Sequence, residues 1–212
     1  MCTLINYKQK RIVYIKTLNS IHVTLMLTID ETDRKIISLL AENPELSQSE
    51  IGQLLKMSQP AVGARVHKLR KQGAIAHQIG VNLRKAHLGI AKIDLSTNNS
   101  AKVLEIFEKC PLFLNGFVTS GKSNLCLFLV IEDLASLDAC MDCHIRANPH
   151  VSNVELSVVV SSARDVIFPM NLIRRKTEIS SCDEKCGICY YYKSERCFGC
   201  PNTTYYKGVL FG

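Results

Sequence analysis

The spacing of apolar residues after position 28 predicts a series of short helices. The first covers residues 30–41, with Asp30 or Thr32 as its cap, and it ends at Asn43-Pro44 because proline disfavours helix in the preceding residue. The second begins at Ser47, and Glu50, three residues on, completes a capping box.

A third helix follows after a tight turn at residues 56–57. Ser58 caps it, Pro60 lies in its first turn and Gly73 provides its C-cap. Three helices joined in this way predict a helix-turn-helix. Their expected core residues are Ile36, Ile37, Leu39, Leu40, Ile51, Leu54, Leu55, Val62, Val66 and Leu69.

The pattern then changes to short β-branched runs that alternate with two amphipathic helices. After a lead-in strand over residues 75–81, it predicts a βαββαβ layout, which is ferredoxin-like. The predicted elements are strand 90–95, helix 101–109, strands 113–119 and 125–131, helix 134–147 and strand 154–161. The expected fold class is therefore α+β.

Composition is that of an ordinary globular protein, with 47% hydrophobic and 21% charged residues. No apolar run approaches the ~18 residues of a membrane span, and no signal peptide is evident, so we expect a cytoplasmic protein without a membrane partner. The net charge is +7, and residues 58–75 contain Arg65, Lys68, Arg70 and Lys71 but no acid. A basic third helix favours contact with a polyanion, although a solvated helix face would have the same composition.

If the third helix enters the major groove of DNA, its polar side and the two helix starts supply the contacts. Gln59 can pair with base edges, Arg65 can reach guanine or phosphate, and Gly63 would allow close approach to DNA. The candidate DNA-binding residues are Ser47, Gln48, Ser58, Gln59, Ala61, Gly63, Ala64, Arg65, His67 and Lys68.

Three motifs in this region resemble the Lrp/AsnC family of transcriptional regulators. They are Ile29-Asp30-x-x-Asp33-Arg34-Lys35-Ile36-Ile37-x-Leu39-Leu40, Leu46-Ser47-x-x-x-Ile51-Gly52 and Ser58-x-x-x-Val62-x-x-Arg65-Val66-x-x-Leu69-x-x-x-Gly73-x-Ile75. The resemblance extends over about residues 28–168. It implies a winged or helix-turn-helix domain followed by a ligand-responsive ferredoxin-like domain that dimerises through its sheet and holds effectors at subunit interfaces.

The turn between the two central strands departs from the family pattern. Many members carry Gly-x-x-Asp there, whereas this chain has Gly121-Lys122-Ser123-Asn124. An amide binds a ligand's ammonium group more weakly than a carboxylate does. Gly121, Lys122 and Asn124 are thus candidate effector contacts, and the alternative is a plain hairpin turn.

The last 31 residues contain five of the ten cysteines, as Cys182-x3-Cys186-x2-Cys189-x7-Cys197-x2-Cys200. So short a segment usually needs a disulfide, a metal or a partner to fold, and the expected reducing compartment favours a metal. Two C-x-x-C pairs suit tetrahedral Zn²⁺, with Cys186, Cys189, Cys197 and Cys200 as ligands. Cys182 is left as a spare thiol, an alternate ligand or a redox-active thiol.

The cysteines also fit other cofactors and other roles. A [4Fe–4S] cluster is the alternative to zinc, because Cys200-Pro201 resembles the end of ferredoxin cysteine runs, and metal-free dithiol switching is a third option. Cys140-x-x-Cys143-His144 matches a haem attachment signature but falls inside a predicted helix, so we interpret these cysteines, like Cys110 and Cys126, as structural.

The predicted organisation has six parts. They are a basic extension over residues 1–27 (upstream of a second candidate start at Met26), a DNA-binding domain over 28–75, a connecting strand over 76–87, an effector and dimerisation domain over 88–168, a linker over 169–181 and a cysteine-rich module over 182–212.

We predict a sequence-specific regulator of Lrp/AsnC type that binds double-stranded DNA as a homodimer or octamer. It would respond to a small-molecule effector, or to metal or redox state through its cysteines. We do not expect an enzyme; the alternatives are an Lrp-like sirohaem decarboxylase and a metal-binding adaptor without specific DNA binding.

Overall fold

The computed structural model describes residues 29–181 and 183–211, so the predicted extension over 1–27 and Cys182 lie outside the described residues. The chain divides into two compact units, with the boundary between Gln78 and Ile79. Within the described residues, none of the helices has the length and apolar character needed to cross a membrane.

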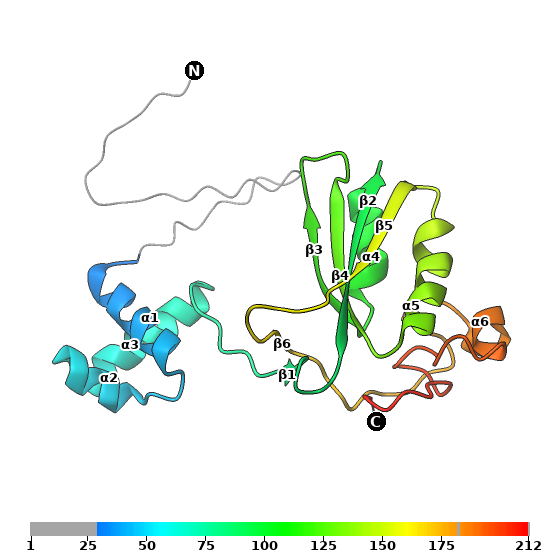
Figure 1. Ribbon diagram of the computed structural model, residues 1–212. Helices are drawn as coiled ribbons and strands as arrows, with labels where there is room; N and C mark the ends of the chain where they lie inside the picture. Colours follow the sequence, from blue (N-terminus) through cyan, green and yellow to red (C-terminus); the bar gives the residue numbers. More distant parts are fainter. Residues whose placement is uncertain (1–28, 182, 212) are drawn as a thin grey trace, which may run out of the picture. The chain divides into compact units, whose positions relative to one another are not determined.

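The first unit consists of the three predicted helices, α1 (Glu31–Glu42), α2 (Gln48–Leu55) and α3 (Gln59–Lys71) (Figure 1). The predicted starts of the second and third helices are confirmed. The Ser47 side chain caps α2 in a full capping box with Glu50, and Ser58 caps α3. Asp30 caps α1. The buried core residues are Ile36, Ile51, Val62, Val66 and Leu69.

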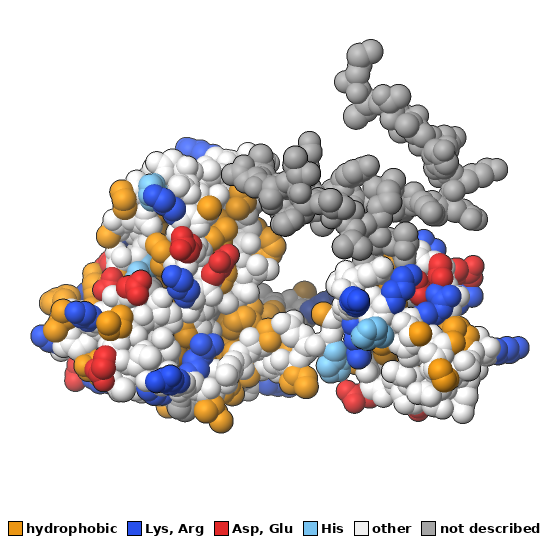
Figure 2. Space-filling model, turned by 180° about the vertical axis from the view of Figure 1, so that it is seen from behind, with side chains coloured by type: hydrophobic (Ala, Val, Ile, Leu, Met, Phe, Trp, Pro, Cys, Tyr) orange, Lys and Arg blue, Asp and Glu red, His pale blue; other side chains and the backbone are white. Residues whose placement is uncertain are grey.

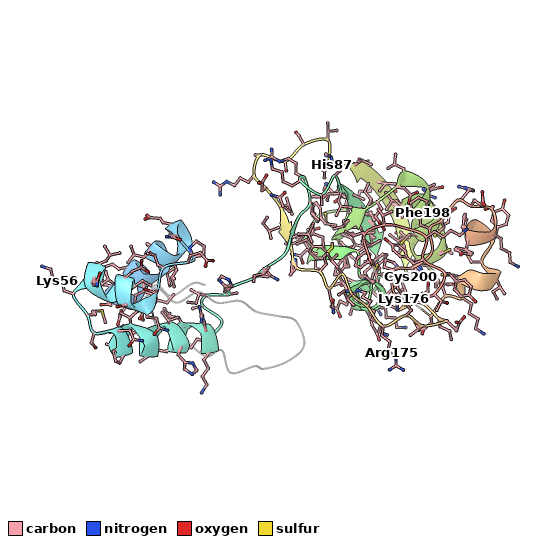
Figure 3. The ribbon with its side chains drawn as sticks, turned by 90° about the horizontal axis from the view of Figure 1, so that it is seen from below. Lys56, His87, Arg175, Lys176, Phe198 and Cys200 are labelled. Carbon is pink, nitrogen blue, oxygen red and sulfur yellow. The ribbon has the colours of Figure 1, made fainter. Side chains whose placement is uncertain are left out.

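The turn between α2 and α3 depends on two special backbone positions. Lys56, which is labelled in Figure 3, adopts a left-handed conformation with φ of 54°. A Cβ at Gly52 would stand 2.7 Å from the carbonyl oxygen of Met57, so a larger residue would push the turn apart. The prediction that Leu54 belongs to the core is wrong: this side chain is 60% exposed, because α2 is short and turns only one narrow side toward its neighbours.

The second unit contains the predicted βαββαβ layout. Its elements are β2 (Gly89–Thr97), α4 (Ser100–Glu108), β3 (Phe113–Val118), β4 (Leu125–Ile131), α5 (Leu134–Met141) and β5 (Val151–Val158). The four strands form an antiparallel sheet in the order β3-β4-β2-β5. A π turn, η1 (Asp142–Arg146), continues α5 to the end of the predicted helix.

Alternation along the central strand decides which face of this sheet is covered. Ala91, Ile93 and Leu95 of β2 are fully buried and pack with Phe107 of α4 and Met141 of α5. Both helices therefore cover one face (Figure 1). The opposite face includes the Lys92–Asp94 ion pair.

The predicted lead-in strand over residues 75–81 does not form. Residues 76–79 are exposed, and only β1 (Val81–Asn82) pairs with another strand, β6 (Ile167–Phe168). A strand needs a neighbour to pair with, and this part of the chain pairs with β6 only from Val81 onward.

The C-terminal segment packs onto the same unit and is not separated from it by a free linker. Thr177, inside the predicted linker, forms a bridge with Thr203, and Lys176 donates to the carbonyl oxygen of Pro201 at 3.0 Å (Figure 3 labels Lys176 and the neighbouring Cys200). The segment contains the 3-10 turn η2 (Cys186–Ile188) and the short helix α6 (Tyr190–Lys193), which lies beside the end of α5 (Figure 1).

Candidate nucleic-acid interface

The outward side of α3 is basic. Its last turn contains Lys68, Arg70 and Lys71, and its first turn contains no acid. Figure 2 shows Lys, Arg and His side chains gathered on one side of this domain. The exposed residues on this part of α3 are Ala64, His67, Lys68, Arg70 and Lys71. Positive charge beside small side chains suits a helix that lies close to a phosphate backbone.

Arg65 does not belong to this exposed surface. Its NH1 donates to Asp33 Oδ1 at 2.7 Å and to Asp30 Oδ2 at 2.6 Å, and the Asp33 side chain is 0% exposed. The hydrogen bonds to Asp30 and Asp33 raise the pKa of Arg65, and the hydrogen bond from Arg65 lowers the pKa of Asp30. Arg65 therefore compensates a buried carboxylate and joins α3 to α1. Its direct contact with DNA stays a prediction.

Gly63 also faces its own domain. A Cβ at Gly63 would stand 2.6 Å from Gln48 Oε1, the atom that accepts a hydrogen bond from Gln59 Nε2 at 3.3 Å. The missing side chain therefore makes room for a Gln48–Gln59 pair between α2 and α3. Close approach of Gly63 to DNA stays a prediction. This pair borders an open hollow of about 540 Å³, which Ser47 and Arg70 also line.

Ser47 and Ser58 cap the N-termini of α2 and α3. Ser47 Oγ accepts from the backbone N–H of Glu50 at 3.2 Å, and Ser58 Oγ accepts from that of Ala61 at 3.4 Å. Both serines remain exposed, so their positions at the positive ends of two helices still suit a phosphate. Their contact with DNA stays a prediction.

The candidate effector turn, between β3 and β4, is hydrogen-bonded to the end of the neighbouring strand β2. Asn124 Oδ1 accepts from the backbone N–H of Thr97 at 2.8 Å, and Asn124 Nδ2 donates to the Thr97 carbonyl oxygen at 2.8 Å. The Lys122 carbonyl oxygen accepts from Ser96 Oγ at 2.8 Å. An amide satisfies both Thr97 groups at once, which favours the hairpin-turn interpretation; effector binding by Gly121, Lys122 and Asn124 stays a prediction.

The predicted metal ligands lie at the contact between the tail and α5. Cys186 is buried, and Cys189, Cys197 and Cys200 are half-buried. Gly199 N–H donates to Cys197 Sγ at 3.4 Å, and Cys200 Sγ donates to Asn202 Oδ1 at 2.7 Å. Among residues 29–181 and 183–211, no group of three or more His, Cys, Asp or Glu side chains is arranged to hold a metal ion as it stands. Zinc and the iron–sulfur cluster therefore stay predictions.

One cysteine of η1 lies near this segment. Burial raises the pKa of Cys143 to about 11, and the neighbouring charges of Cys189, Glu184 and Cys197 add to the rise. Burial also raises the pKa of Cys197, to which the charges of Cys186 and Cys189 contribute. The structure thus brings Cys143, which the sequence interpretation treated as merely structural, toward the tail cysteines.

Comparison with known proteins finds a family match for the helices of the first unit. Residues 29–70 match the AsnC-type helix-turn-helix domain. The chain carries an AsnC-type helix-turn-helix domain.

Relatives extend the likeness beyond this AsnC-type domain. A transcriptional regulator of the helix-turn-helix type from Mycobacterium tuberculosis is 28% identical over 155 residues, which cover 66% of this chain and 98% of that protein. The transcriptional regulator AzlB of Bacillus subtilis is 26% identical, over 66% of this chain and 94% of its own. Both relatives carry the names of transcriptional regulators, the class of protein that the sequence predicts.

Solved structures show the same fold over a similar share of the chain. Escherichia coli AsnC superposes with a TM-score of 0.56 at 17% identity, covering 65% of this chain and 95% of its own. A Neisseria meningitidis transcriptional regulator in complex with L-Met has a TM-score of 0.57 at 20% identity, covering 68% and 97%. These likenesses show a shared fold, and each covers about two thirds of this chain.

The candidate DNA-binding set omitted Arg70, the last residue of the matched AsnC-type domain, and Lys71, which follows it directly. Both are exposed in the last turn of α3. Their positive charge was evident in the sequence. The direction in which their side chains point depends on the end of α3 at Lys71 and on the packing of Leu69.

Proposed function

We propose that the chain is a transcriptional regulator that binds double-stranded DNA through α3 of its AsnC-type domain. The observation that carries this proposal is the exposed basic side of α3, with the cations Lys68, Arg70 and Lys71 beside the small Ala64. A helix of this kind fits the major groove, and its cations neutralise phosphates.

Recognition of a specific sequence would come from the exposed residues near the start of α3. Gln59 can pair with base edges, although it competes with its hydrogen bond to Gln48. The face that points away from the core stripe presents Ala64, His67 and Lys68. The residues proposed to contact DNA are Ser47, Gln48, Ser58, Gln59, Ala61, Ala64, His67, Lys68, Arg70 and Lys71.

The helix-free face of the sheet supports dimer formation. Phe117 of β3 is 49% exposed and packs edge to face with Phe128 of β4, with ring centroids 6.0 Å apart. Exposed aromatic residues on an open sheet face are suited to cover the same face of a second copy. A dimer would place two recognition helices about 34 Å apart on successive turns of DNA. An octamer would need further contacts.

The proposed function is tested by selecting the fragments of the source genome that bind the protein. The full chain is incubated with sheared genomic DNA in excess competitor, and the bound fragments are sequenced. Enrichment of short segments with two-fold symmetric half-sites about one helical turn apart supports the proposal. Uniform recovery of all fragments would leave only non-specific binding and would favour the adaptor alternative.

The same material tests the remaining alternatives. A Soret-type spectral change on addition of a tetrapyrrole would favour the decarboxylase. A metabolite screen, with L-Met included because one structural neighbour was solved with it, tests a small-molecule effector. A response to metal or redox state would act through the tail, which packs on α5 in the second unit.

A further inference from the structure

A small cavity lies between β4, α5 and the C-terminal tail (residues 183–211). It has a volume of about 60 Å³, and its walls are mostly apolar, with Leu129 on β4, Leu137 on α5 and Phe198 on the tail. One water-sized sphere takes about 15 Å³ of such a volume. The cavity therefore has room for about four non-hydrogen atoms.

Asp133 lines this cavity and has one oxygen that the protein leaves unsatisfied. Its Oδ1 accepts from the backbone N–H of Ser136 at 2.8 Å and so caps α5. Its Oδ2 is buried and has no hydrogen-bond partner among the described residues. A carboxylate oxygen that is removed from water destabilises the fold unless a donor reaches it. The cavity is the space from which a donor can approach Asp133.

The electrostatic character of the cavity is negative. Glu132 also lines it, and its carboxylate accepts from Tyr206 Oη at 2.5 Å and from the backbone N–H of Leu210 at 3.1 Å. The positive end of α5 offsets part of the charge of Asp133. Among the described residues that line the cavity there is no Lys, Arg or His to balance the rest. A cationic donor is therefore favoured over a neutral one.

The apolar walls select the kind of cation. A metal ion needs several ligands, and no group of three or more His, Cys, Asp or Glu side chains among residues 29–181 and 183–211 could hold one. An alkylammonium ion needs only acceptors for its N–H groups, and its carbon chain gains by leaving water for the buried Leu129 and Leu137. An α-amino acid fits less well, because its carboxylate would meet Glu132 and Asp133 without a cation beside them.

The tail closes one side of the cavity. The backbone N–H of Phe198 donates to Ser136 Oγ at 2.9 Å, and Arg196 NH2 donates to Asp138 Oδ2 at 2.9 Å, so this part of the tail is fastened to α5. The side chain of Phe198, which Figure 3 labels, is 38% exposed, so the cavity borders solvent there. A molecule in the cavity would contact both α5 and the tail.

We propose that this cavity binds a small primary alkylammonium ion, whose N–H groups donate to Asp133 Oδ2 and whose carbon chain lies against Leu129 and Leu137. The inference goes beyond DNA binding and does not rest on it. A size of about four non-hydrogen atoms corresponds to the n-propylammonium ion. The site is separate from the candidate effector turn over residues 121–124, which does not line the cavity.

The test is a titration of the full chain, labelled at its leucine methyl groups, with n-propylammonium chloride at pH 7, followed by NMR. Three probes separate the contributions: n-propanol keeps the carbon chain without the charge, propionate reverses the charge, and ammonium chloride lacks the chain. Asp133→Asn keeps an oxygen for the Ser136 N–H, and so the cap of α5, but removes the carboxylate. Glu105→Gln, at an exposed acid of α4, is the matched control.

Wild type and Glu105→Gln are expected to show saturable shifts of the Leu129 and Leu137 methyl signals, with a Kd of about 1 mM or lower. Asp133→Asn, with wild-type circular dichroism, should bind n-propylammonium at least about tenfold more weakly. The three other probes should bind wild type more weakly by a similar factor. Shifts that do not saturate in wild type overturn the proposal. So does equal binding by Asp133→Asn, or binding of n-propanol as tight as that of n-propylammonium.

Discussion

The guanidinium of Arg65 on α3 donates to the carboxylate of Asp33 on α1 at 2.7 Å, and the Asp33 side chain is fully buried. Asp30 accepts from the same nitrogen at 2.6 Å, and Lys68 approaches Asp33 at 3.8 Å. A buried carboxylate needs a cation, so this contact fixes α3 against α1.

The first prediction concerns this contact. Arg65→Ala should lower the free energy of unfolding of the AsnC-type domain by about 2–3 kcal/mol, because it leaves Asp33 buried without its main partner. The value is lower than for a fully buried pair, since the Arg65 side chain is 31% exposed. Urea denaturation followed by circular dichroism measures it.

Lys35→Ala is the matched control for Arg65→Ala. Lys35 pairs with Glu31 on the exposed side of α1, so its loss should change stability by less than about 0.5 kcal/mol. An Arg65→Ala protein as stable as wild type, but defective in DNA binding, would favour Arg65 as a DNA contact and contradict the structural role.

The second prediction concerns the turn between β3 and β4. Asn124→Asp removes the donor to the Thr97 carbonyl oxygen and places a second acceptor beside it, so stability should fall by about 2 kcal/mol. Thermal unfolding measures the loss. Unchanged stability together with new binding of an amino acid would show instead that this position is an effector site.

The third prediction is the pH dependence of tail docking. The hydrogen bond from Tyr191 lowers the pKa of Asp142 from its ordinary 3.8, so its contribution is present above pH 3.8 and is lost as pH falls through the lowered value. The same bond raises the pKa of Tyr191 to about 12, so that contribution is present below pH 10 and is lost as pH rises toward 12.

Hydrogen exchange read by mass spectrometry checks the docking contact inside this pH window. Peptides covering residues 190–198 should be protected at pH 7 and should exchange faster in Tyr191→Phe, whereas Tyr190→Phe, an exposed neighbour, should resemble wild type. Equal protection in both variants would argue against docking through Asp142.

The fourth prediction concerns self-association. Phe117→Asp places a charge on the open face of the sheet and should convert a dimer to a monomer in sedimentation equilibrium. Val160→Asp, at a 98% exposed residue beyond β5, is the control and should leave the mass unchanged. A dimer that survives Phe117→Asp would place the interface elsewhere.

Features that depend on neighbours in sequence were predictable. The capping box of Ser47 and Glu50 spans three residues, and the core stripe of Val62, Val66 and Leu69 follows helical periodicity. The strands of the sheet were likewise predictable from short apolar and β-branched runs in the sequence.

Features that depend on distant contacts were not predictable by these means. Arg65 and Asp33 are 32 residues apart, so the basic pattern of α3 favoured a DNA contact for Arg65. One signal was present: Asp33 lies three residues before Ile36 on the buried side of α1, where an acid requires a partner. Arg196 and Asp138 are 58 residues apart, and nothing local indicated that the tail would pack on α5.

The most direct test of the account is the salt dependence of DNA binding, measured by fluorescence anisotropy on a duplex recovered from the genomic selection. Wild type and Lys35→Ala should show the same linear fall of log affinity with log salt, whereas Lys71→Ala should bind more weakly with a slope smaller by about one unit. Binding that is insensitive to salt, or identical in Lys71→Ala and in the triple variant with Lys68→Ala and Arg70→Ala, would contradict DNA recognition by α3.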